Sequence, residues 1–383
     1  MLHPNDGSLT FARSVARRGV RVDALVTDEF QYVLASRWVD GTVMPDIASA
    51  SSAWFDEVSL RAEQEPVVLV CGSDAAVEWV VRHRHRLPAH VRCFEGPGSG
   101  HLQLMDKFRL YKLAAEIGVK TPSMHVVASR QQLSMITDSL EYPCVLKASL
   151  GHLGKKVLGY GTVVAHSTAD LMQHADPLLR SNVEFLLTEL VPGPESALEG
   201  AVAIRCQDGT YPMEYGRRKV RQWPLDYGVG SLTESADVPE MIAINRRILE
   251  HARFHGLASC EAKRHSVTGE LHLIEVNVRM PGSFGLADAC GADGSWRLYA
   301  TLAGLPLEAA PSQKHGRKVM LPTKDLAASL QRIRRRESSA LSILRSLRGV
   351  RDVGALHWRD PSPALSLGLQ MVRKGYRFMR RRA

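Results

Sequence analysis

The segment from residue 256 to residue 283, GLASCEAKRHSVTGELHLIEVNVRMPGS, constrains the fold of this chain more than any other. Two strand-like runs flank a turn centred on Thr268, which predicts a β-hairpin over residues 258–278. In that register Glu261 lies directly opposite Glu275. Directly opposed side chains have Cβ atoms about 4.5–5.5 Å apart, and like charges there are destabilising. The hairpin therefore predicts two carboxylates that need a cation between them.

Strand alternation adds a carboxamide to this pair, because Asn277 lies on the same face as Glu275. Glu261, Glu275 and Asn277 all offer oxygen atoms, which suits Mg²⁺ or Mn²⁺ better than zinc. The sequence thus predicts a site for one or two such ions, with Arg279 on the same face. The alternative is a solvated strand face on which Glu275 pairs with Lys263, and the hairpin alone does not decide between the two.

The opposite face of the second strand carries Ile274, Val276 and Val278, which can pack in a core. Leu273 departs from this pattern, since strict alternation puts it on the acidic face.

The first hundred residues alternate between helical and strand patterns, which predicts an α/β layer with a parallel sheet. We expect helices over residues 9–18 and from Ser73 or Asp74 to about His83, and buried strands at 22–26 and 66–72. The turn at residues 5–8 resembles a strand-to-helix turn, yet no apolar strand precedes it. We therefore expect the first strand to be missing from the chain or from the sheet.

A glycine-rich stretch at 93–104 is expected to be a linker. Beyond it the patterns predict helices at 105–117, 168–180 and 238–255, and strands at 143–148, 183–190 and 200–222. The pattern loosens after residue 310.

Lysines at the ends of elements indicate phosphate binding. Lys107 opens the helix after the linker, and Lys147 ends an apolar strand. A loop of small residues follows, with Ser149, Gly151 and Gly154, and glycines let backbone N–H groups approach phosphate oxygens. The order of residues is not that of a Walker A loop. The alternative for each lysine is an ordinary solvated side chain.

Two further segments are candidate ligand contacts. Residues 186–195 form a strand that runs into a sharp turn, so that the backbone at Glu189, Leu190 and Val191 could meet an adenine edge and Glu195 could take ribose hydroxyls. The alternative is an ordinary strand and turn.

The second segment carries four cations within five residues: Arg217, Arg218, Lys219 and Arg221. Strand alternation puts three of them on one side. A triphosphate is a suitable counter-charge, so Lys219 and Arg221 are candidate catalytic cations, and a basic surface face is the alternative.

Taken in order, these segments resemble the ATP-grasp superfamily, and most closely its predicted carboxylate–amine ligases and D-aspartate ligase. The resemblance covers roughly residues 1–305. It is carried by the segments Asp106-Lys107-Phe108, Val145-Leu146-Lys147, Thr188-Glu189-Leu190-Val191-Pro192-Gly193, Arg218-Lys219-Val220-Arg221-Gln222 and Glu275-Val276-Asn277-Val278-Arg279. Val278 stands where the family often has proline.

The resemblance implies a mixed α/β and α+β architecture in which two α+β subdomains clasp ATP. The implied divisions are a Rossmann-like domain at 1–100, a small subdomain at 101–190, a metal-binding subdomain at 191–310 and a basic extension at 311–383. It further implies that Lys107 and Lys147 contact ATP phosphates and that the segment 148–156 closes over them. Arg279 would stabilise charge on an acyl phosphate.

The implied activity is ATP- and Mg²⁺-dependent joining of a small-molecule carboxylate to an amine. The alternatives are an enzyme of the same fold with a non-amine acceptor, a non-catalytic nucleotide-binding module and a dinucleotide-dependent enzyme. The last ranks lowest, because no G-x-G-x-x-G follows a strand.

The distribution of charge along the chain indicates which kinds of partner it favours. The net charge is +9, but residues 331–383 carry fourteen Lys/Arg against three Asp/Glu, which leaves 35 against 37 elsewhere. The body therefore does not favour nucleic-acid binding. The basic, amphipathic tail at 363–382 could contact a membrane surface or an acidic partner, or cover the catalytic domain. Six scattered cysteines and a start without an apolar run predict a cytoplasmic protein, for which we also consider a homodimer.

Overall fold

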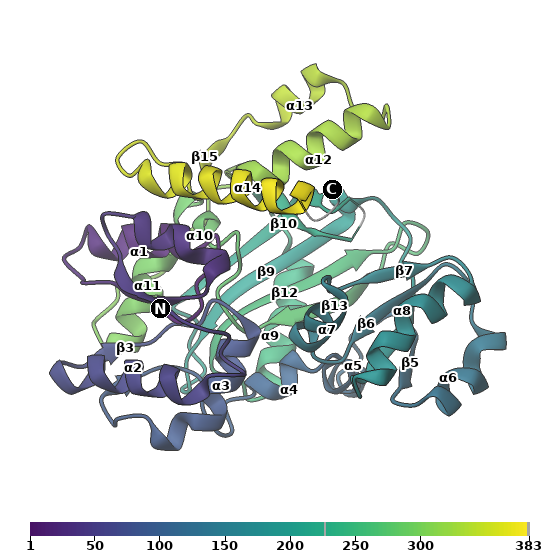
Figure 1. Ribbon diagram of the computed structural model, residues 1–383, viewed down its shortest axis with the longest axis horizontal. Coiled ribbons are helices and arrows are strands. Elements are labelled where there is room, and N and C mark those ends of the chain that lie inside the picture. Colours follow the sequence, from purple (N-terminus) through teal and green to yellow (C-terminus); the bar gives the residue numbers. More distant parts are fainter. Residues whose placement is uncertain (226, 381–383) are drawn as a thin grey trace.

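The computed structural model describes residues 1–225 and 227–380 and has an N-terminal α/β layer, a four-stranded sheet and a seven-stranded sheet (Figure 1). The N-terminal layer contains α1 (Ser8–Ala16), β1 (Asp23–Val26), η1 (Asp28–Ala35), β2 (Asp40–Val43), α2 (Ser51–Gln64), β3 (Val67–Val68), α3 (Asp74–His83), η2 (Arg84–Arg86), β4 (Val91–Arg92) and α4 (His101–Met105). Its strand pairs β1–β2 and β3–β4 are parallel, as the alternating pattern predicts. Ser73 caps α3 by accepting a hydrogen bond from the Ala76 amide at 3.1 Å.

The expectation that the first strand is missing is wrong, because Leu2 takes that position between the two pairs. It forms parallel bridges with Leu25 and with Cys71. Its amide donates to the Val70 carbonyl at 2.9 Å, and its carbonyl accepts from the Gly72 amide at 2.9 Å. One bridging residue is too short to produce a strand pattern in the sequence.

The four-stranded sheet is antiparallel, in the order β5-β8-β6-β7. Its unit contains α5 (Lys107–Glu116), β5 (Met124–Val127), α6 (Arg130–Ile136), η3 (Thr137–Ser139), β6 (Cys144–Ala148), α7 (Gly151–Leu158), β7 (Val163–Ala165), α8 (Thr168–Arg180) and β8 (Phe185–Glu189). The apolar face of α8 contributes Leu171, Ala175 and Leu178 to the same core as Phe185 and Leu187 of β8. The predicted linker at 93–104 includes most of α4, so only its first part is irregular.

The seven-stranded sheet has the order β13-β12-β9-β10-β11-β14-β15 and is antiparallel except for its last pair. The elements from residue 195 on are η4 (Glu195–Ala197), β9 (Leu198–Arg205), β10 (Met213–Trp223), β11 (Val229–Ser235), α9 (Pro239–His251), β12 (Gly256–Arg264), β13 (Leu271–Asn277), α10 (Gly285–Ala289), α11 (Gly294–Ala303), β14 (Lys318–Met320), α12 (Pro322–Arg334), α13 (Ala340–Ser346), β15 (Val350–Asp352) and α14 (Ser362–Arg380). β14 and β15 thus extend this sheet, although the sequence pattern is loose there.

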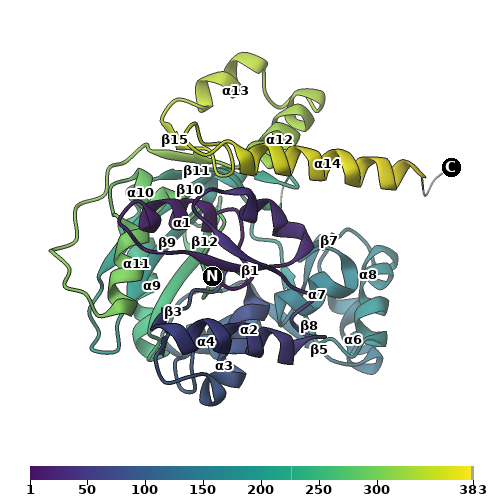
Figure 2. The same cartoon turned by 60° about the vertical axis from the view of Figure 1, so that its left-hand side comes forward.

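One apolar core joins the N-terminal layer to the large sheet. It runs from Trp54 and Val77 through Ile248 of α9 to Val276 of β13, all at most 5% exposed. The end of β13 therefore lies where the N-terminal layer meets the sheet. In the two views α12, α13 and α14 lie along one side of the molecule (Figures 1 and 2). None of the helices among the described residues is long and apolar enough to cross a membrane.

Candidate active site

The predicted hairpin is present, and its register is the predicted one at the acidic pair. Glu261 on β12 lies opposite Glu275 on β13, and Ser259 lies opposite Asn277. The register shifts by one residue beyond Glu261, because Ala262 faces Leu273. This β-bulge turns Leu273 into the core, where it is fully buried, and leaves Ile274 only partly buried. The bulge explains why strict alternation misplaced Leu273.

The polar face of β13 forms a hydrogen-bonded chain that reaches the N-terminal layer. The Asn277 amide nitrogen donates to Glu275 at 2.8 Å, and its amide oxygen accepts from the Arg279 guanidinium at 3.2 Å. Arg279 Nε donates to Asp74 at the start of α3 at 3.0 Å. Glu275 and Asn277 of β13, and Arg279 just beyond its end, alternate with buried Val276 and Val278. These hydrogen bonds hold one carboxylate, one carboxamide and one guanidinium on the same face of the hairpin.

Glu261 has a different environment from Glu275. Its carboxylate accepts from Arg217 at 2.5 Å and from Lys219 at 2.7 Å, and all three side chains are buried. Burial alone would raise the pKa of Glu261, but the two cations outweigh it and hold that pKa below its usual range. The Glu261 carboxylate therefore stays ionised and neutralises cations that the sheet buries.

Two lysines approach the carboxylates from the four-stranded unit. Lys107 is the first residue of α5, and its backbone amide donates to Ser149 O at 3.1 Å. Lys147 lies on β6 and is only partly exposed. The loss of water around its ammonium lowers the pKa of Lys147 to about 8, and neighbouring Glu275 opposes this shift.

The segment 148–156 is not a loop as predicted, because Gly151 begins the helix α7. Gly154 serves close packing, since a Cβ built there would lie 2.5 Å from the Ala148 Cβ on β6. At Gly151 a built Cβ would lie 3.4 Å from Lys107 Nζ, so this ammonium lies over the first turn of α7. A helix N-terminus favours anions, and a lysine beside it adds to the positive potential.

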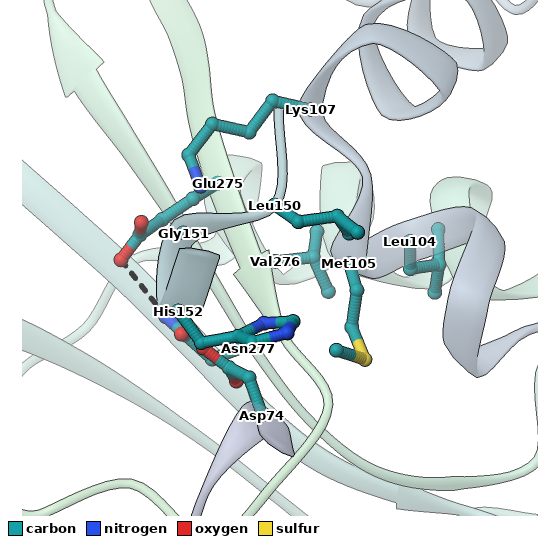
Figure 3. Close-up of a pocket in the computed structure, with 10 residues that line it drawn as sticks. All are labelled: Asp74, Leu104, Met105, Lys107, Leu150, Gly151, His152, Glu275, Val276 and Asn277. Carbon is teal, nitrogen blue, oxygen red and sulfur yellow. Dashed lines mark hydrogen bonds between the residues drawn. The ribbon is translucent and has the colours of Figure 1, made fainter. Parts of the chain in front are cut away.

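A pocket brings part of the predicted set together (Figure 3). Lys107, Gly151, Glu275 and Asn277 line it, together with residues that the sequence analysis did not name individually as site residues: Asp74, Leu104, Met105, Leu150, His152 and Val276. The sequence identified Asp74 only as a helix-capping candidate. His152 lies within the predicted phosphate segment and contacts Glu78 at 2.9 Å. The hydrogen bond to His152 lowers the pKa of Glu78 to about 2.

Other predicted residues do not line this pocket. Arg221 forms a two-pronged ion pair with Asp325 of α12, at 2.9 and 2.8 Å. Glu195 pairs with Arg332 of α12 at 2.6 Å. The Ser149 hydroxyl donates to Glu184 at 2.7 Å. The side chains of Arg221, Glu195 and Ser149 thus each contact a charged residue of the protein outside the pocket lining.

The predicted adenine-binding backbone lies at the end of β8. Glu189 is about half exposed and accepts from the Ser123 amide at 3.1 Å, whereas Val191 is buried. Within residues 1–225 and 227–380, no hydrogen bond joins the backbone of Leu190 or Val191 to another group.

The family comparison supports the resemblance inferred from sequence. A family model described as "ATP-grasp in the biosynthetic pathway with Ter operon" matches residues 181–324, from the start of β8 into α12. The chain has the ATP-grasp fold. The predicted superfamily and fold class are thus confirmed, whereas the closer likeness to D-aspartate ligase stays a prediction. No curated protein gives a significant match to the sequence.

Solved structures share the fold at low sequence identity. The L-amino acid ligase from Bacillus licheniformis is 14% identical with a TM-score of 0.59, covering 80% of this chain and 74% of that one. N5-carboxyaminoimidazole synthetase from Staphylococcus aureus, complexed with ADP, is 14% identical with a TM-score of 0.61, covering 82% and 78%. The biotin carboxylase domain of Hydrogenobacter thermophilus 2-oxoglutarate carboxylase, complexed with MgADP and bicarbonate, is 13% identical with a TM-score of 0.62, covering 83% and 72%.

Proposed function

We propose that this ATP-grasp protein is an ATP- and Mg²⁺-dependent ligase that activates a small-molecule carboxylate as an acyl phosphate and joins it to an amine. The observation that carries the proposal is the convergence of Lys107, Glu275 and Asn277 on one pocket, with Arg279 held beside them. They come from two units of the fold, between which a ligand would be clasped.

The charge of this region fits a metal–nucleotide complex. Five cations gather around the acidic pair: Lys107, Lys147, Arg217, Lys219 and Arg279. They face three carboxylates, those of Asp74, Glu261 and Glu275. The excess of two positive charges would be neutralised by a triphosphate that carries a divalent ion.

The donor set also fits magnesium or manganese. Glu261, Glu275 and Asn277 would hold one or two ions through oxygen atoms, and Mg²⁺ characteristically leaves its other positions to water and phosphates. When bound, the ion would neutralise charge on the β- and γ-phosphates.

The other predicted site residues would contact the phosphates, the adenine and the ribose of the nucleotide. Lys107 and Lys147 would bind phosphates at the start of α7, where Ser149, Gly151 and Gly154 shape the close approach of α7 to β6. The backbone at Glu189, Leu190 and Val191 would meet the adenine, and Glu195 the ribose. With the proposed domain divisions at 1–100, 101–190, 191–310 and 311–383, the pocket would be lined by the second and third parts, with Asp74 from the first.

The chemistry that these residues would support has two steps. A substrate carboxylate oxygen attacks the γ-phosphorus, the bond to the bridging oxygen breaks, and an acyl phosphate and ADP result. The amine then attacks the acyl carbon, phosphate leaves, and the nitrogen loses a proton to water. Arg279 and Lys219 would stabilise the negative charge that develops, and Arg221, two residues beyond Lys219 on β10, would add to the positive potential, so catalysis consists mainly of positioning and electrostatics.

The names of the similar structures support this chemistry, since they include an amino acid ligase. The acceptor is the least constrained part, and a non-amine acceptor is the alternative; a nucleotide-binding module without activity is the other. We further propose a cytoplasmic enzyme, with a homodimer as a possible assembly.

The test is release of ADP and phosphate in a matrix of carboxylates against acceptors. Amino acids, hydroxy acids and small peptides would be combined with amine and thiol acceptors. We expect ATP consumption only when a carboxylate is present, and an amide product with an amine. Consumption with thiols alone would favour the other acceptor class. A sample that binds MgADP but consumes no ATP in any combination would favour the non-catalytic module.

A further inference from the structure

Exposed apolar side chains gather in the C-terminal part of the chain. Twenty large apolar side chains are exposed among the described residues, and eleven of them lie between residues 326 and 372. Isolated exposed apolar residues are normal on protein surfaces, but a concentration of this kind marks an interaction site.

The spacing of these side chains gives stripes on two helices. Leu326, Leu330 and Ile333 repeat at i, i+4 and i+7 along α12, and they are 62%, 47% and 39% exposed. On α14, Leu365, Leu369 and Val372 repeat at the same spacing and are 68%, 61% and 72% exposed. The opposite side of α14 packs Leu367 toward the N-terminal layer.

The shorter helix α13 adds Leu341 and Leu344, and Trp358 in the segment before α14 is 78% exposed. The guanidinium of Arg359 lies 4.4 Å from the centre of the Trp358 ring. Both views place α12, α13 and α14 on the same side of the molecule (Figures 1 and 2). We call the exposed side chains of these helices, together with Trp358, the C-terminal surface.

Two of the three acidic side chains in residues 331–383 turn inward, while several cations of this region turn outward. Asp360 is buried against Arg13 at 2.8 Å, and Asp352 accepts from Thr10 at 2.6 Å. Of the three acids in residues 331–383, only Glu337 is exposed. The cations Arg334, Arg336, Arg345 and Arg348 are all exposed. The fold thus concentrates positive charge beside the apolar stripes.

We propose that the C-terminal surface docks on an anionic lipid bilayer surface. Apolar stripes beside outward cations suit the interface between headgroups and acyl chains, and an exposed tryptophan suits the same region. Anionic lipids attract each arginine near the surface. A second copy fits less well, because two surfaces of the same sign would repel each other. A nucleic acid would leave the leucine stripes unused.

The test is flotation of the full chain with vesicles of phosphatidylcholine alone and of phosphatidylcholine with a quarter phosphatidylglycerol. We expect binding to the anionic vesicles, weakened at high salt, and little to the neutral ones. Leu365→Gln with Leu369→Gln should weaken binding roughly tenfold or more. The matched control is Leu60→Gln with Met135→Gln, at side chains exposed 54% and 76% on α2 and α6.

A second pair of variants tests the charge. Replacing Arg334, Arg336, Arg345 and Arg348 by Gln should weaken binding to anionic vesicles roughly a hundredfold. The same four changes at Arg109, Lys112, Arg130 and Arg180, exposed on α5, α6 and α8, should leave it within about threefold. Equal binding to both vesicle types, or none, would overturn the proposal. So would a dimer in solution that the Leu365 and Leu369 changes dissociate, or capture by an acidic protein without vesicle binding.

Discussion

Glu261 offers the most discriminating perturbation of the candidate site, because it has a structural role that its neighbour across the strands lacks. In Glu261→Gln the carboxylate that faces Arg217 and Lys219 becomes neutral, while both cations stay buried. Removing one partner of a buried ion pair costs about 3–5 kcal/mol, since the remaining charge is left uncompensated. We therefore expect the free energy of unfolding to fall by about that amount at pH 7.

The matched control is Glu275→Gln on β13. Glu275 is partly exposed, and its hydrogen bond is to the Asn277 amide. Losing such a contact costs about 1 kcal/mol. Urea unfolding followed by circular dichroism compares the two variants with the wild type. A Glu261→Gln midpoint as high as that of Glu275→Gln would refute the reasoning, because it would mean that the cations do not depend on this carboxylate.

The pH dependence gives a second check on the same carboxylate. Arg217 and Lys219 hold the pKa of Glu261 below its usual range. Its contribution to stability is therefore complete above the pKa of the unfolded chain, about 4.3, and is lost as pH falls through the lower folded value. The difference in unfolding free energy between wild type and Glu261→Gln should persist at pH 5 and vanish only in stronger acid.

Four further outcomes follow from the site. Glu275→Ala or Asn277→Ala should abolish ATP consumption in an ADP-release assay while the circular dichroism spectrum is unchanged, and wild-type-like turnover would refute the metal assignment. Lys147→Ala should raise the nucleotide Kd roughly ten- to a hundredfold by calorimetry, since a charge-assisted contact is worth about 1.5–3 kcal/mol. Because burial lowers the pKa of Lys147 to about 8, wild-type affinity should fall as pH rises above that value, and an unchanged Kd in either experiment would count against its role. Gly154→Ala should lower the thermal midpoint by forcing α7 off β6, whereas Gly161→Ala, where a Cβ meets nothing within 4 Å, should not.

The hairpin shows which structural details the sequence alone could predict. Period-2 alternation and one turn were enough to predict that Glu261 faces Glu275, because register follows from local pattern. The bulge beside this pair was missed, since an extra residue in one strand changes the alternation without a distinct signal. Leu273 was the only indication of it.

Contacts that no local pattern reveals account for the other differences. The ion pair of Arg221, a predicted catalytic cation, with Asp325 was not foreseen, because the two residues are 104 positions apart and no local pattern connects them. The first strand was missed because Leu2 alone fills it. Small residues after β6 were interpreted as a loop, whereas Gly154 permits a helix to pack against Ala148. The partners of Arg221 and Leu2 lie outside the window in which a pattern can be recognised. Gly154 and Ala148 are close in sequence, and there the helix is decided by packing that the pattern of small residues does not show.

The most direct test of the central claim is a titration of the wild-type chain with Mn²⁺ in the presence and absence of ADP, followed by electron paramagnetic resonance. The account predicts one or two ions that bind tightly only with nucleotide, and loss of that binding in Glu275→Ala and Asn277→Ala. Binding of Mn²⁺ that is the same in these variants as in the wild type, or a wild-type chain that takes up no ion when ADP is present, would contradict it.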